Sequence, residues 1–270
     1  LSSTDISGLT LHLGQIDKAS GRASSDYEEL RIAGGTNRVD QFRFAGGDYK
    51  LTPELVLSYY AAELQDYYRQ HYLGAVHNTA IGPGKLHTDL RYFDSNAHGA
   101  NDRQRPGYGA SGFQNAGKVD NTAASAFFNY SLGSHGFGLG YQHLSGSSHF
   151  PFVNNGDGAT AYLITDSQIG KFQRAGEKTW LGRYSYDFAQ LGAPGLKGSF
   201  TYLRGSDIDA AVPGRDKEWE RNVRLDYTVQ DGPLKNLSLS LRSAALRSSV
   251  VGQRDIDETR FIVSYSVPLI

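Results

Sequence analysis

The sequence predicts an all-β protein, an antiparallel transmembrane β-barrel, and two patterns carry this prediction. The first is a period of two in the side chains, and the second is an alternation of short turns with long loops. Trp180, Tyr184 and Phe188 share one parity with other apolar residues, whereas Arg183 and Asp187 lie on the other. Successive side chains of a strand point to opposite faces. Because a dry core does not accept unpaired charges, the polar face must be wet and the apolar face must contact lipid.

Composition narrows the class of protein. The 270 residues are 39% hydrophobic but include no apolar run that could form a membrane helix, which excludes a helical membrane protein. The absence of cysteine excludes disulfides, thiolate nucleophiles and sulfur metal sites. A formal net charge of -1 argues against nucleic acid as a partner. We expect outer-membrane lipid, or detergent in vitro, to cover the apolar face.

Twelve segments show the alternation, and most have about the ten residues that a tilted strand needs to cross a bilayer. The predicted strands are 8–17, 38–47, 54–64, 66–77, 85–94, 122–132, 136–145, 177–188, 196–205, 217–230, 235–247 and 257–269. The sequence starts at Leu1 without a signal peptide. Because an outer-membrane protein is exported, we expect that a signal was removed or is not included.

The connections between these strands alternate in length. Short turns rich in Gly and Pro are predicted at 82–84, 133–136, 192–195 and 231–233, and long polar loops at 18–37, 95–121, 146–176, 206–216 and 248–256. Only the connection near Gln65 breaks this rule by being short. Outer-membrane barrels have short periplasmic turns and long external loops. A soluble β-sandwich or a soluble barrel is the alternative, but either would favour Val, Ile and Leu over tyrosines near strand ends.

The arginines divide into two groups by parity. An arginine that faces lipid at the middle of the bilayer costs about 2–4 kcal/mol, and one at the interface about 0–1 kcal/mol. Three arginines have the outward parity at strand ends, where their side chains can reach water: Arg204, Arg221 and Arg247. The inward parity is predicted for Arg43, Arg91, Arg183, Arg224, Arg242 and Arg260, together with Lys197.

A column of positive charge along a pore would attract carboxylates and pass them between weak sites. Arginine suits this task because its guanidinium binds a carboxylate through two hydrogen bonds. The alternative is that these arginines only pair with acids on the same faces, namely Asp89, Asp187 and Asp226, and stiffen the wall. For any single arginine both interpretations stay open, and the group as a whole favours a pathway.

Several stretches of the chain also resemble a known family. They include Gly46-Gly47-Asp48-Tyr49, Phe150-Pro151-Phe152, Asn155-Gly156-Asp157-Gly158, Ala175-Gly176-Glu177-Lys178-Thr179-Trp180, Pro194-Gly195-Leu196, Glu218-Trp219-Glu220-Arg221, Gln230-Asp231-Gly232-Pro233-Leu234 and Arg260-Phe261-Ile262-Val263-Ser264-Tyr265. In these residues the chain resembles the OprD-type porins, the substrate-specific outer-membrane channels of Gram-negative bacteria. The resemblance covers nearly the whole chain.

The resemblance implies an eighteen-stranded monomeric barrel with a narrow pore for amino acids, short peptides or aromatic acids. It implies a ladder of basic residues that includes Arg183, Arg224, Arg242 and Arg260. It also implies a constriction to which loop 146–176 contributes Tyr162, Thr165, Asp166 and Ser167. The twelve predicted strands match the last twelve of eighteen, so residues 1–270 are expected to be one barrel domain that lacks six N-terminal strands and the third external loop. Ser240 departs from the family, which often has an additional arginine on that strand.

Two other classes of function are compatible with an outer-membrane barrel. A hydrolase at the barrel rim is not supported, because the sequence has no Gly-x-Ser-x-Gly turn and no His-Glu-x-x-His helix. We expect neither catalysis nor a cofactor. An adhesin or receptor that binds a partner through its external loops is the remaining alternative, since these loops are polar and rich in Gly, Asn, Asp and Ser.

Overall fold

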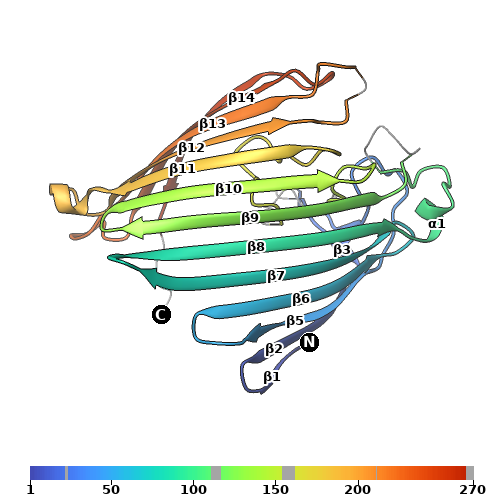
Figure 1. Ribbon diagram of the computed structural model, residues 1–270, viewed down its shortest axis with the longest axis horizontal. Helices are drawn as coiled ribbons and strands as arrows, with labels where there is room; N and C mark the ends of the chain where they lie inside the picture. Colours follow the sequence, from blue (N-terminus) through green and yellow to red (C-terminus); the bar gives the residue numbers. More distant parts are fainter. Residues whose placement is uncertain (22–23, 111–116, 154–161, 211, 266–270) are drawn as a thin grey trace.

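The chain folds into one long, curved antiparallel sheet (Figure 1). A computed structural model describes residues 1–21, 24–110, 117–153, 162–210 and 212–265. In them, thirteen strands lie in sequence order, each beside the next. These strands are β1 (Ser2–Ile6), β2 (Leu9–Ile16), β5 (Phe42–Lys50), β6 (Leu55–Leu64), β7 (Tyr68–Ile81), β8 (Gly84–Ala97), β9 (Asp120–Leu132), β10 (His135–Ser145), β11 (Lys178–Asp187), β12 (Leu196–Ser206), β13 (Glu218–Thr228), β14 (Ser238–Ser248) and β15 (Ile256–Ser264).

Each of the twelve predicted strands is confirmed, with shifts of a few residues at the ends. Sequence reasoning missed β1, which is short and mostly polar and pairs irregularly with β2. It also missed a small separate sheet of β3 (Lys18–Ala19) and β4 (Glu28–Glu29). The predicted end of the last strand, 266–269, and the middle of the long loop, 154–161, lie outside the described residues.

The connections place the long loops at one end of the strands and the tight turns at the other. In Figure 1 the right-hand end carries α1 (Gly99–Asp102), and the left-hand end carries the short turns and the 3-10 helix η1 (Phe188–Leu191). We call these ends the loop edge and the turn edge. Within the described part of the chain, no helix is long and apolar enough to cross a membrane.

One face of the sheet is covered with exposed apolar side chains. Phe137, Tyr184, Phe200 and Val223 stand directly opposite one another across β10 to β13, and all four are exposed. Trp180 on this face is 57% exposed, and Phe261 is 68% exposed. We call this the outer face. Exposed apolar rows of this extent are expected where the solvent is lipid.

The opposite, inner face is covered near the loop edge by long connections that fold back over it. Phe172, from the connection between β10 and β11, packs with Leu181, Leu203 and Leu246 of three strands, and all four are buried. Phe150 and Phe152 of the same connection pack with Phe93 of β8. The apolar core of the protein therefore lies between the inner face and its loops, beside the polar side chains that line the rest of this face.

Candidate substrate-binding site on the inner face

Three of the predicted arginines stand side by side on the inner face. In the strand register Arg224 of β13 lies opposite Arg242 of β14, and Arg242 lies opposite Arg260 of β15. Directly opposed side chains on one face of a sheet have Cβ atoms about 4.5–5.5 Å apart. We call these three residues the arginine row. Three cations at this spacing form a site that attracts anions.

The outer members of the arginine row each form an ion pair with an acid on their own strand, whereas over the described residues the middle member forms none. Arg224 Nε lies 2.5 Å from Asp226 Oδ2, and Arg260 Nε lies 2.6 Å from Glu258 Oε1. Arg242 Nε donates to Ser240 Oγ at 3.1 Å, and over the described ranges Arg242 forms no ion pair with an acid. Among the three, Arg242 therefore has the guanidinium that is most available to a ligand.

The other predicted inner-face cations lie outside the row. Arg183 is on the inner face, one level nearer the loop edge than the row, and its Nε donates to Thr201 Oγ1 at 3.3 Å. Its guanidinium also lies 5.4 Å from the centre of the Phe127 ring. Lys197 lies nearer the turn edge and pairs with Asp187 at 3.3 Å. Asp187 therefore neutralises Lys197 and leaves Arg183 without this predicted partner.

Arg91 lies on β8, three strands away from β11 in the sheet order. Its Nη2 is 2.6 Å from Asp89 Oδ2, and its Nη1 donates to the carbonyl of Tyr162 at 3.0 Å. Arg91 therefore connects the wall to the loop and is not brought together with the arginine row.

The register contradicts the predicted inward direction of Arg43. This residue lies opposite Gln15 and Glu63 and shares its parity on β5 with Ala45 and Tyr49. These positions belong to the outer face, where Tyr49 is exposed. The inward parity of this strand is taken by Phe42, which packs against the apolar cluster of the loop-edge connections, and by Phe44, whose ring lies against Gly14 of β2. At this end of the strand the apolar side chains therefore point to the inner face and not to the lipid.

The register agrees with the outward parity predicted for the three rim arginines. Arg204 lies opposite Trp180 and Trp219, and Arg247 lies opposite Trp219. Arg221 lies opposite Tyr202 on the same face. Arg247 also makes an ion pair with Asp257 at 2.9 Å, close to the loop edge.

The constriction-loop residues have different positions. Asn222 Nδ2 of β13 donates to Ser167 Oγ at 2.8 Å, which sets Ser167 against the inner face. Tyr162 is exposed, whereas Thr165 is buried and its hydroxyl donates to the Lys171 carbonyl at 3.0 Å. Asp166 is half-buried, and its backbone N–H donates to the Leu163 carbonyl. Thr165 therefore has a partner within its own loop.

The loop also contacts the arginine row itself. Gln168 Nε2 donates to Glu258 Oε1 at 2.8 Å, and Arg260 Nη2 donates to the Gln168 carbonyl at 3.3 Å. A ligand at Arg242 would thus lie beside both the wall and the loop.

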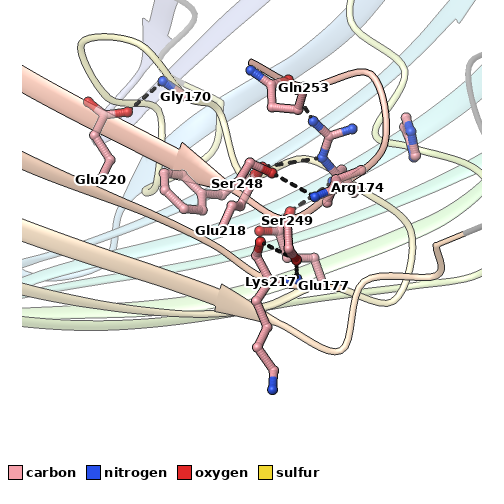
Figure 2. A network of polar contacts seen from close by, with 12 residues as sticks. Gly170, Arg174, Glu177, Lys217, Glu218, Glu220, Ser248, Ser249 and Gln253 are labelled. Atoms are coloured by element: carbon pink, nitrogen blue, oxygen red, sulfur yellow. Dashed lines mark hydrogen bonds and ion pairs between the residues drawn. The ribbon is translucent and has the colours of Figure 1, made fainter. Parts of the chain in front are cut away.

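Glu220 of β13 holds this part of the loop in place, and sequence reasoning did not find it. Its carboxylate is fully buried and accepts from the backbone N–H group of Ile169 at 3.2 Å. It also accepts from the backbone N–H group of Gly170 at 2.6 Å, and Figure 2 shows this contact. Hydrogen bonds to an ionised acceptor are among the stronger ones in proteins. In the sequence, the only signal that Glu220 anchors a loop is that an acid stands at an inward-facing position near the loop edge.

A second group of contacts anchors the C-terminal end of the same loop. Arg174 Nε lies 3.4 Å from Glu218 Oε2, and its Nη2 donates to Gln253 Oε1 at 2.8 Å (Figure 2). Ala175 N–H donates to Nδ1 of the buried His149 at 3.1 Å, and burial with the nearby Arg174 lowers the pKa of His149 to about 4. Burial, with the charge of Glu218, raises the pKa of Glu177.

Over the residues described, no cluster of three or more His, Asp or Glu side chains could hold a metal ion.

Comparison with known proteins identifies the family. Residues 1–269 match the model of the OprD family of outer membrane porins. The chain belongs to the OprD family. Porins of this family are integral β-barrel proteins of the outer membrane, and so is this one.

Solved OprD-family structures share this fold. The crystal structure of OccK8 (OprE) from Pseudomonas aeruginosa is 47% identical, with a TM-score of 0.93 over 100% of this chain and 70% of that chain. The P. aeruginosa OpdK structure with vanillate is 33% identical, with a TM-score of 0.87 over 98% of this chain and 66% of that one. The barrels of these relatives have 18 strands.

Two curated relatives are longer than this chain. Porin D of P. aeruginosa is 31% identical over 291 residues, and the porin-like protein GalP of Pseudomonas putida is 32% identical over 274 residues. The chain spans 63% of the length of Porin D and 62% of the length of GalP.

Proposed function

We propose that this OprD-family porin conducts small carboxylate-bearing solutes across the outer membrane and that Arg242 binds their carboxylate. The observation that carries the proposal is the arginine row, whose middle member donates to Ser240 and, over the described residues, forms no ion pair. Asp226 and Glu258 form ion pairs with Arg224 and Arg260, which lowers the charge of the arginine row but leaves Arg242 without an ion pair over the described residues. The site therefore has a net attraction for one anionic group.

The strength of this attraction suits transport. At a separation of 4 Å, two unit charges attract by about 1 kcal/mol in bulk water and about 4 kcal/mol at the effective dielectric of a protein surface. A site whose attraction energy lies between these two values concentrates an anion and still releases it quickly, and conduction requires both. Arg183, nearer the loop edge, and Lys197, nearer the turn edge, would flank such a site as further positions of positive charge.

The loop gives the site a second wall. Ser167 and Gln168 are bound to Asn222 and Glu258 beside the arginine row, so polar groups of the loop lie close to a solute at Arg242. The OpdK structure with vanillate, a carboxylate, supports the proposed class of solute.

Uptake by proteoliposomes tests the proposal. The full-length protein should transport a carboxylate faster than its neutral amide analogue of the same size, and Arg242→Ala should reduce that preference. Arg221→Ala, which removes an arginine from the outer face, is the matched control and should leave the preference unchanged. Equal transport of acid and amide by the unsubstituted protein would reject the proposal.

A further inference from the structure

A groove of about 330 Å³ lies on the outer face near the loop edge of β2, β5, β6 and β7. Arg43, Glu63, Arg69 and His71 are among its lining residues. The groove is separate from the arginine row, which is on the inner face of β13 to β15. It faces the membrane near the loop edge, where basic side chains attract anionic lipid headgroups.

The floor of the groove is lined by small side chains. In the register Leu13, Ala45, Ala61 and His71 form one row across four strands. Leu13 projects from the outer face, whereas Ala45 and Ala61 between it and His71 are only methyl groups. The distance across the row is three strand spacings, about 14 Å. On β5 the next outward position toward the turn edge, Gly47, lies against the side chain of Leu11, so Ala45 and Ala61 form the floor of a short apolar furrow.

Two arginines stand at the loop-edge end of this furrow. The next row consists of Gln15, Arg43, Glu63 and Arg69. Arg69 Nε pairs with Glu63 at 2.7 Å, whereas Arg43 Nε donates to the neutral Gln15 side chain at 2.9 Å. Within the described ranges Arg43 has no ion pair, and Asp17 accepts from the other side of Gln15. The row itself has two arginines and one glutamate, and Asp17 lies just beyond it on Gln15. Arg43 is therefore the arginine of this row whose guanidinium is not paired with an acid over the described residues.

We propose that this groove binds one membrane lipid whose headgroup bears a phosphate. Part of an acyl chain fits the furrow over Ala45 and Ala61, and Arg43 and Arg69 face the level at which the headgroup lies. A guanidinium binds phosphate oxygens through two parallel hydrogen bonds, and basic residues at the interface attract anionic lipids. The apolar floor selects a lipid over free phosphate. This inference concerns the outer face and does not depend on which solute the pore carries.

Native mass spectrometry of the detergent-solubilised full-length protein tests it, with phosphatidylglycerol as the probe. The unsubstituted protein should retain one phosphatidylglycerol, and Arg43→Ala should weaken that binding about fivefold, the usual contribution of one basic residue near an anionic headgroup. Ala45→Leu, which fills the furrow without changing the charge, should also weaken it. Arg204→Ala is the matched control, because Arg204 is an outer-face arginine between two tryptophans.

The alternatives give different results. Equal loss of lipid in Arg204→Ala and Arg43→Ala would overturn the site in favour of general interfacial charge. Unchanged binding in both Arg43→Ala and Ala45→Leu would overturn it as well. Displacement of the lipid by millimolar inorganic phosphate would show that the furrow adds nothing and would contradict the choice of a lipid. Circular dichroism confirms that each variant is folded, and Arg43→Gln serves as a second charge variant.

Discussion

Removing the Glu220 carboxylate should release the segment of the loop beside the arginine row. Glu220→Ala deletes two hydrogen bonds from backbone N–H groups, at 3.2 Å from Ile169 and 2.6 Å from Gly170. Hydrogen bonds to a charged group contribute about 1.5–3 kcal/mol each, so the two together contribute about 3 kcal/mol or more. Since 1.4 kcal/mol is a factor of ten, the detached population of this segment should rise by about two orders of magnitude.

A spin label measures this release directly. The chain has no cysteine, so Ser167→Cys creates a single labelling position next to the segment. The label should be immobile in the otherwise unsubstituted protein and should gain a mobile component in Glu220→Ala. Glu220→Gln retains one acceptor oxygen and should be intermediate. Glu54→Ala, a change in an exposed turn at the opposite edge, is the control. A label of unchanged mobility in Glu220→Ala would refute the anchoring role.

Three further predictions concern the same loop and row. Phe172→Ala removes a buried ring between three leucines, so it should destabilise the docked loop by about 3–5 kcal/mol and increase its cleavage in limited proteolysis. Burial lowers the pKa of His149 to about 4, so its neutral ring stabilises the docked loop fully above about pH 6.5. This stabilisation is lost as the pH falls toward 4 and the ring becomes protonated. The label at position 167 should become more mobile over that range, and a pH-independent signal would contradict this. Arg242→Lys keeps the positive charge but loses the planar guanidinium that binds a carboxylate through two hydrogen bonds. In proteoliposome uptake, its preference for carboxylate over amide should therefore lie between those of the unsubstituted protein and Arg242→Ala. A preference equal to that of Arg242→Ala would show that charge alone contributes nothing.

Much of the sheet could be predicted from the sequence, because strand periodicity is a local property. Trp180, Tyr184 and Phe261 are exposed on the outer face as their parity predicts. β1 was missed because its residues, Ser2–Ile6, lack an apolar alternation. Its position depends on pairing with β2, which no local pattern records.

The candidate site was predictable only in part. The parity of Arg224, Arg242 and Arg260 put them on one face, but their direct opposition depends on the register of three strands. Arg43 was assigned to the wrong face because Phe42 and Phe44 both point inward, Phe42 toward the loop-edge cluster and Phe44 onto Gly14, and so imitate a lipid-facing pattern. Glu220 was not recognised because its partners are backbone groups about fifty positions earlier in the chain.

The most direct test of the central claim is to locate a bound carboxylate in a crystal. Crystals of the full-length protein soaked with 4-bromobenzoate should give an anomalous bromine peak on the inner face, with the carboxylate within hydrogen-bond distance of the Arg242 guanidinium. Crystals of Arg242→Ala under the same conditions should lack that peak. A peak elsewhere in the pore, with none near Arg242, would contradict the account.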